Sequence, residues 1–256
     1  MLIELDAVDL VLTLVLIVVA ISVSRWQQLG LEGQLFISAG RALLQLMAMG
    51  YVLELVFTLD TPWSVFGVFL VMIAIATTVT RNRISQKLSR LFWLAGGSFL
   101  LTTGLTLAYV TLLIVQPQTW YDPQYWVPLA GIIIGNAVNG ATIAGERLVN
   151  AIETNRAEIE THLCLGATPK DAIALHRRQA IRAGILPNLN QMALVGLVSI
   201  PGILSGQLLG GVNPLDAVSY QILILFSLAL ANILTTSLIT AGIYRQFFTP
   251  QAQLRV

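Results

Sequence analysis

Apolar runs long enough to cross, or nearly cross, a lipid bilayer constrain the fold of this chain more than any other feature. A helix needs about 20 apolar residues to cross the hydrocarbon core of a bilayer. Runs of this kind lie at about residues 8–24, 34–59, 64–80, 94–115, 127–145, 185–211 and 217–243. Only 11% of the 256 residues are charged, whereas about a quarter are charged in a soluble domain. The sequence therefore predicts an all-α, polytopic integral membrane protein with about seven transmembrane helices, forming one domain over residues 1–256.

The basic residues indicate the orientation of these runs, because Lys and Arg accumulate on the cytoplasmic side of membrane proteins. They all border or occupy alternate connections or lie in the C-terminal tail, at Arg25, Arg41, Arg81, Arg83, Lys87, Arg90, Arg147, Arg156, Lys170, Arg177, Arg178, Arg182, Arg245 and Arg255. The opposite side carries acids alone, at Glu4, Asp6, Asp9, Asp60, Asp122 and Asp216. We therefore expect a multi-pass protein of the inner (plasma) membrane, with its N-terminus outside and its C-terminus in the cytoplasm. A net charge of +1 gives no argument for a nucleic-acid partner.

The one long charged segment predicts a cytoplasmic pair of helices at about residues 146–184. Apolar residues recur in its first half at helical spacing, at Leu148, Ile152, Ile159 and Leu163. Gly166 is expected to end the first helix with a positive φ, and Thr168 and Pro169 to cap and begin the second. Two helices that meet at a rigid turn on a membrane surface are suited to docking another protein. We interpret Gly166–Pro169, called the corner below, as part of a coupling element.

An acidic side chain inside the second run is a candidate for a transport path. A charged carboxylate costs about 2.5–3.5 kcal/mol at the centre of a membrane helix, so it usually faces the protein interior or water. Met47, Gly50 and Glu54 share one helix face. This stripe is consistent with an outward-opening cation path, and equally with a Glu54 carboxylate that reaches the lipid headgroups.

Three amides in later runs are weaker candidates for the same path. Asn136 and Asn139 are three residues apart in the fifth run and so share a helix face, and Gln207 lies in the sixth. A buried amide in a membrane helix needs a hydrogen-bonding partner. That partner is either the cargo in a wet path or a neighbouring helix, and the sequence leaves both alternatives open.

The sixth run contains a proline and a ridge of glycines. Pro201 removes one backbone hydrogen bond and is expected to kink or break the helix. Gly202, Gly206 and Gly210 recur every four residues, a pattern that lets another helix pack closely. The partner of this ridge is either another helix of the same chain or a second copy.

Several kinds of site are missing from the sequence. Neither lysine, Lys87 or Lys170, stands in a GxxxxGK[ST] motif, so the chain has no P-loop for ATP. The spacing of His162, Cys164 and His176 does not favour a metal site, and no catalytic constellation is recognisable. These features predict a transporter permease that is not itself an enzyme. A secondary transporter and a membrane scaffold or assembly factor are the alternatives.

Three motifs resemble a known family. They are GNAVNG at 135–140, E-x5-G-A-T-P from Glu160 to Pro169, and VGLVSIPGILSGQLLGGVNPLDAVSYQI at 195–222. They are similar to the iron-export ABC transporter permeases of the FetB type, which include plant aluminium-tolerance permeases. The resemblance covers most of the chain and is strongest between about residues 130 and 225.

The resemblance implies a permease subunit that exports iron or another small solute. It implies pairing with a separate cytosolic P-loop ATPase, with two copies of each subunit in the complex. ATP and Mg²⁺ would bind to the partner subunit, and this chain would hold no cofactor. Contacts with the ATPase are expected at Glu160, Gly166, Ala167, Thr168 and Pro169.

Overall fold

The computed structural model of this protein is helical and describes residues 6–85, 88, 90–249, 251 and 253–254. Within those residues no strand forms, and β pairing is limited to two isolated bridges. In the described part of the chain, five helices are long and apolar enough to cross a membrane. The predicted class, an all-α polytopic membrane protein, is confirmed. Glu4, Lys87 and Arg255, which entered the orientation argument, lie outside the described residues.

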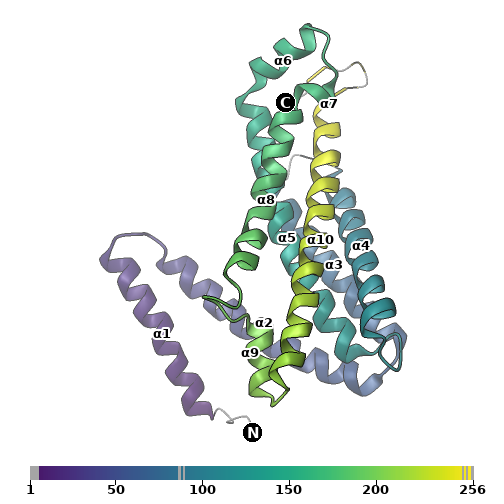
Figure 1. The fold of residues 1–256 in the computed structure, drawn as a ribbon. Helices are drawn as coiled ribbons and strands as arrows, with labels where there is room; N and C mark the ends of the chain where they lie inside the picture. The colour runs from purple at the N-terminus through teal and green to yellow at the C-terminus, as the bar shows by residue number, and fades with distance from the viewer. Residues whose placement is uncertain (1–5, 86–87, 89, 250, 252, 255–256) are drawn as a thin grey trace. The chain divides into compact units, whose positions relative to one another are not determined.

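By its internal contacts the chain divides into two units, and the first is a helical hairpin. This unit covers Met1–Asp60 with Leu209–Gly211, and the second covers Thr61–Leu208 with Val212–Val256. The hairpin consists of α1 (Ala7–Trp26) and α2 (Glu32–Leu59), joined by a short turn (Figure 1). The Ser24 hydroxyl donates a hydrogen bond of 3.2 Å to the Glu32 carboxylate across this turn. A single domain over residues 1–256 stays a prediction.

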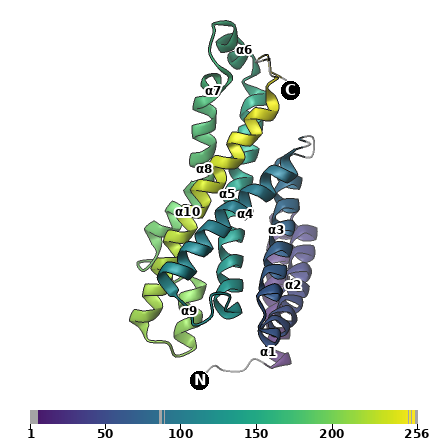
Figure 2. The ribbon, with the colours of Figure 1, turned by 90° about the vertical axis from the view of Figure 1, so that its right-hand side faces the viewer.

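Four long helices form the core of the second unit. They are α3 (Pro62–Ile84), α4 (Leu91–Tyr109), α5 (Pro123–Thr154) and α10 (Pro214–Phe247). A π-helical turn, η1 (Val110–Val115), extends α4. Helices α3 and α10 each pack against both α4 and α5 (Figure 2). The buried faces combine large apolar side chains with many Ala, Thr and Ser residues, which allow the helix axes to approach closely.

Local sequence determines where three of these helices begin. Helices α3, α5 and α10 each start with a proline, which suits the first helical position because it has no N–H to satisfy. The preceding residues, Thr61, Asp122 and Asn213, each accept a hydrogen bond from a backbone N–H of the first turn. The predicted spans 64–80, 127–145 and 217–243 therefore lie inside longer helices.

The sixth predicted span, residues 185–211, is wrong as a single helix. Helix α8 (Ala174–Leu194) ends within this span, and seven residues separate it from α9 (Gly202–Leu209). Of the two outcomes predicted for Pro201, a kink or a break, the structure shows a break, and Pro201 is the residue immediately before α9. Gly196, with φ +79°, turns the chain between the two helices. The first predicted span forms α1, whose apolar part Val11–Trp26 is shorter than the five long helices.

The charged segment is also divided differently from the prediction. Helix α5 continues without a break from its apolar part to Thr154, so the first predicted cytoplasmic helix is partly an extension of a span. A short helix, α6 (Arg156–Cys164), follows, then one turn, α7 (Pro169–Ala172), then α8. The break at Asn155 is stabilised by its own side chain, which donates 2.8 Å to the carbonyl of Ala151.

Candidate functional site

The corner has the geometry that its sequence predicts. Gly166 follows the end of α6 with φ +90°, a conformation that disfavours other residue types. Its N–H donates to the carbonyl of Leu163, and the N–H of Ala167 donates to the carbonyl of His162, both at 3.0 Å. These two bonds form a Schellman motif, which satisfies the last carbonyls of α6. The predicted helix stop at Gly166 is confirmed.

Thr168 and Pro169 start the next helix as predicted. The hydroxyl of Thr168 accepts from the N–H of Asp171 at 3.3 Å and donates to its carboxylate at 2.6 Å. Pro169 occupies the first position of α7. The two ends of the corner are therefore fixed by local hydrogen bonds, and the corner is a defined shape on the surface.

Buried isoleucines attach the corner to the helices beneath it. Ile159 of α6 and Ile173, between α7 and α8, are both fully buried. Leu165, by contrast, is 79% exposed at the apex, and Gly166 and Thr168 are exposed beside it. The corner thus combines a fixed base with an exposed tip, which is the arrangement that a rigid docking element requires.

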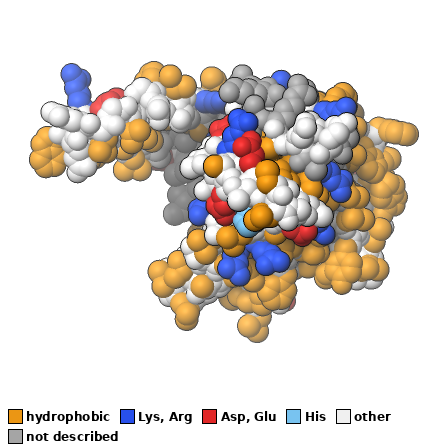
Figure 3. All heavy atoms as spheres, turned by 90° about the horizontal axis from the view of Figure 1, so that it is seen from above, with side chains coloured by type: hydrophobic (Ala, Val, Ile, Leu, Met, Phe, Trp, Pro, Cys, Tyr) orange, Lys and Arg blue, Asp and Glu red, His pale blue; other side chains and the backbone are white. Residues whose placement is uncertain are grey.

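Charged side chains gather on the face of the molecule that carries α6 and α7 (Figure 3). Glu160 is paired with Arg156 at 2.8 Å, and both side chains are about half exposed. The Glu158 carboxylate lies 4.0 Å from Nε2 of both His162 and His176. Glu160 therefore belongs to a solvated charged surface next to the corner, where a partner protein can reach it.

A second polar arrangement lies where α5, α8 and α10 cross. The side-chain nitrogen of Asn232, on α10, donates to the carbonyl of Gly184 on α8 at 3.3 Å and to the Asn136 amide oxygen on α5 at 3.5 Å. Asn232 is 1% exposed, and its own amide oxygen has no hydrogen-bond partner among the described residues. For Asn136, the structure thus supplies the interhelical bond that was one of its two predicted roles.

Two glycines make this crossing possible. A Cβ at Gly140 would overlap the amide of Asn232, and a Cβ at Gly184 would lie 2.5 Å from the carbonyl oxygen of Gly140. Real side chains do not tolerate such contacts. The sequence reasoning missed the roles of Gly184 and Asn232, although an amide in the middle of the last apolar run was an available signal.

Two more polar side chains of α8, Arg177 and Asn188, hold it to α10. The Arg177 guanidinium donates to the hydroxyl of Thr240 at 3.3 Å and to the carbonyl of Ser237 at 3.1 Å. It also lies 5.9 Å from the centre of the Tyr244 ring. The buried amide of Asn188 donates to the carbonyl of Leu228 at 3.3 Å. Helix α8 is therefore bound to α10 along most of its length.

The other candidates for a transport path are on α2, α5 and α9, and no hydrogen bond among the described residues joins them to Asn232. Met47 and Glu54 lie on α2, in the first unit, and both are exposed. Asn139 is exposed on α5, whereas Gln207 on α9 is partly buried, with an amide oxygen that has no partner in the described part of the chain. The structure therefore brings only Asn136 into a polar cluster.

The predicted glycine ridge has no close neighbour within the described residues. A Cβ at Gly202 or Gly206 would meet no atom within 4 Å. Pro201 precedes this helix, and Gly210 follows its last residue. Close helix packing through these residues, against another helix of this chain or against a second copy, stays a prediction.

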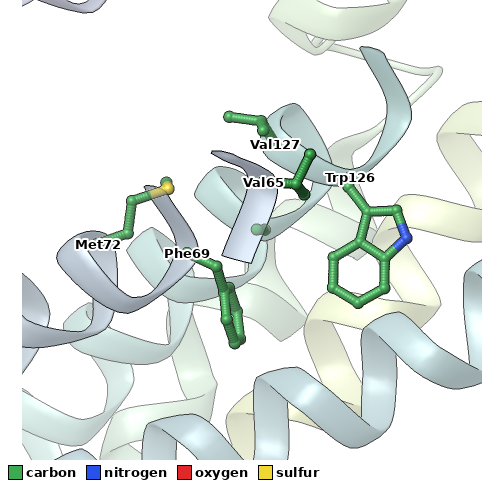
Figure 4. A pocket seen from close by; sticks show the side chains of 6 residues that line it. Val65, Phe69, Met72, Trp126 and Val127 are labelled. Atoms are coloured by element: carbon green, nitrogen blue, oxygen red, sulfur yellow. The ribbon is translucent and has the colours of Figure 1, made fainter. Parts of the chain in front are cut away.

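No metal cluster is found among the described residues. No three His, Cys, Asp or Glu side chains there are grouped so that they could hold a metal ion. A small hollow between α3 and α5 has an entirely apolar lining, with Val65, Phe69 and Met72 on one side and Trp126 and Val127 on the other (Figure 4). Such a hollow offers no ligand to a cation.

Comparison with known proteins matches residues 7–248 to the family described as "Uncharacterised protein family (UPF0014)". The chain is 51% identical to "UPF0014 membrane protein slr1647" of Synechocystis, over 100% of this chain and 98% of that protein. It is 34% identical to "Probable iron export permease protein FetB" of Escherichia coli, over 97% and 94% of the two chains. It is 32% identical to "Protein ALUMINUM SENSITIVE 3" of Arabidopsis thaliana, over 94% and 87%. No solved structure matches it.

Proposed function

Because the chain belongs to the UPF0014 family of membrane proteins, we propose that it is the permease subunit of an ABC transporter that exports a metal cation. The cargo class follows from the relative whose name specifies iron export. The energy would come from ATP bound with Mg²⁺ on a separate cytosolic P-loop ATPase. Two copies of each subunit would form the complex.

The observation that carries this proposal is the corner. A Schellman motif and a threonine cap give it one shape, while Leu165 and the surrounding charges remain open to a partner. Such an element transmits force only if it is stiff, since a flexible loop would absorb the movement of the ATPase. We assign the docking surface to Glu160, Gly166, Ala167, Thr168 and Pro169.

ATP-dependent transport tests the proposal. We expect inside-out membrane vesicles that hold the chain and its ATPase to accumulate Fe²⁺ only when ATP and Mg²⁺ are added. A protonophore should leave this uptake unchanged. Uptake that needs a proton gradient and no ATP would instead indicate a secondary transporter, and an absence of uptake would favour a scaffold or assembly factor.

Orientation in the inner membrane is the second part of the proposal, with the N-terminus outside and the C-terminus in the cytoplasm. Cys164, the single cysteine of the chain, is exposed at the end of α6 and should not react with an impermeant thiol reagent in intact cells. Asp216→Cys, made in a Cys164→Ser chain, should react at once because its helix begins outside. Labelling of the two positions in the opposite order would invert the topology.

Glu54→Gln keeps the shape of the side chain and removes its charge. We expect this variant to assemble with the ATPase and to lose most Fe²⁺ export, because the carboxylate would attract the departing cation. Export from iron-loaded cells is the measurement. Asp216→Asn, which also removes an exposed acid, is the matched control and should export normally. Full export by Glu54→Gln would leave Glu54 with a structural role at the headgroups.

A further inference from the structure

Three helix ends of the second unit meet at one place: the end of α3, the start of α4 and the end of α10. The N–H of Arg90, just before α4, donates to the amide oxygen of Gln246 in the last turn of α10 at 3.3 Å. A Cβ at Gly96 of α4 would lie 3.3 Å from the Thr77 hydroxyl oxygen of α3. Each of these ends adjoins a long apolar run, so the meeting point, called the junction below, lies at an interface of the bilayer.

The junction carries four arginines. Arg81 and Arg83 are in the last turn of α3, Arg90 directly precedes α4, and Arg245 is in the last turn of α10. No ion pair in the described part of the chain includes any of them. Like charges on adjoining helix ends repel one another, and the repulsion is stronger next to the low-dielectric membrane than in water. The junction therefore requires negative charge that the described residues do not supply.

Arg81 differs from the other three arginines, whose side chains are exposed. Its side chain is partly buried, and its Nε is fully enclosed without a hydrogen-bond acceptor among the described residues. Thr77, four residues earlier on the same helix face, contacts α4, so Arg81 faces the junction. A buried donor on a charged group is strongly unfavourable when it is unpaired. The position of Arg81 thus indicates an acceptor that enters the junction from outside this chain.

The depth of the junction identifies the kind of acceptor. Arg81 is the first residue after the apolar run 64–80, and Trp93 is in the first turn of α4. Tryptophan side chains favour the level of the lipid headgroups, where every phospholipid has its phosphate. Guanidinium groups bind phosphate through paired N–H donors, and basic pockets between membrane helices bind anionic headgroups. A phosphate held at this level belongs to a lipid whose acyl chains lie along the apolar helices.

We propose that the junction is a binding site for an anionic phospholipid. The lipid phosphate accepts a hydrogen bond from Nε of Arg81, and Arg83, Arg90 and Arg245 supply the remaining positive charge. Because these arginines belong to three helix ends, the bound headgroup joins α3, α4 and α10 at the interface. The site needs neither the ATPase nor a cargo, so it is independent of the proposed function.

Lipid retention by the purified full-length chain tests the site. The chain is exchanged into detergent micelles with equal amounts of phosphatidylglycerol, which is anionic, and phosphatidylcholine, which is zwitterionic, and native mass spectrometry counts the lipids that stay bound. Wild type should retain phosphatidylglycerol in preference to phosphatidylcholine. Arg81→Gln should lower this retention about fivefold, which corresponds to about 1 kcal/mol for one basic residue at an anionic headgroup. Arg178→Gln, which removes an exposed arginine on α8, is the matched control and should retain as much as wild type.

Arg81→Lys keeps the charge and loses the Nε donor, so it should retain more phosphatidylglycerol than Arg81→Gln and less than wild type. It also tests the site if Arg81→Gln does not fold. A second readout is the apparent Tm in detergent. Added phosphatidylglycerol should raise the Tm of wild type and of Arg178→Gln, and it should raise the Tm of Arg81→Lys by a smaller amount.

Four results would contradict the proposal. Retention by Arg81→Lys equal to that of wild type would overturn the role of the buried donor. Equal retention of the two lipids by wild type would overturn the preference for an anionic headgroup, and an equal loss in Arg178→Gln would show that only net charge matters. Release of the lipid when sodium phosphate replaces sodium chloride at the same ionic strength would identify soluble phosphate as the occupant.

Discussion

Gly166→Val should abolish association with the ATPase and leave the chain in the membrane at its normal abundance. Gly166 has φ +90°, and a left-handed backbone costs a β-branched residue about 1–2 kcal/mol or more. A Cβ at this position would meet no atom within 4 Å, so the penalty arises from the backbone and not from a clash. The chain would relieve it by rearranging the corner, and the spans would not be affected.

Gly166→Asn is the matched control, because Asn tolerates the left-handed region better than any other residue with a side chain. It should retain most binding. The measurements are co-purification of the ATPase with the tagged chain and Fe²⁺-stimulated ATP hydrolysis, each normalised to membrane abundance. Normal values for Gly166→Val would remove the corner from the coupling mechanism.

Gly184→Ala should destabilise the second unit, although it adds a single methyl group. That methyl would lie 2.5 Å from the Gly140 carbonyl oxygen and 3.0 Å from Cβ of Ala144. Both of these atoms belong to α5. Helix α8 must therefore move away from α5, which weakens the hydrogen bond from Asn232 to the Gly184 carbonyl. Overpacking of this kind costs about 1–3 kcal/mol. The apparent Tm in detergent should fall by several degrees.

Gly135→Ala is the corresponding control on α5. A Cβ there meets no atom within 4 Å, and alanine is the better helix former, so the Tm should stay constant or rise slightly. Equal Tm values for the two variants would show that α8 can shift without cost. Close packing of α8 against α5 at Gly184 would then not be required for the stability of the second unit.

Helix α8 connects the corner to the helix crossing. This helix starts next to the corner, passes the crossing at Gly184 and ends at Leu194. Arg177 and Asn188 hold α8 to α10 through hydrogen bonds, and Gly184 packs directly against the backbone of α5. A displacement of the corner by the ATPase would therefore be passed on to α5 and α10.

The features that the sequence by itself determined are those with a local cause. The membrane class follows from the length of the apolar runs, and no tertiary contact is needed to predict it. The corner is also local: Gly166, Thr168 and Pro169 satisfy the ends of α6 and α7 through hydrogen bonds that span at most five residues. Capping patterns of this kind can be predicted from the sequence, because Gly favours the position after a helix end and Pro favours the first position of a helix.

Tertiary structure alone decided the helix crossing and the extent of the interruption of the sixth run, for which Pro201 indicated only a kink or a break. The run 185–211 is apolar throughout its second half, and hydropathy does not distinguish a continuous helix from two helices with a loop between them. Gly184 and Gly202 likewise look equivalent in the sequence, yet Gly184 contacts the Gly140 backbone and Gly202 faces open space. The difference arises because close packing depends on which residues of α5 and α10 lie opposite, and that pairing is set by the register of three helices far apart in the chain.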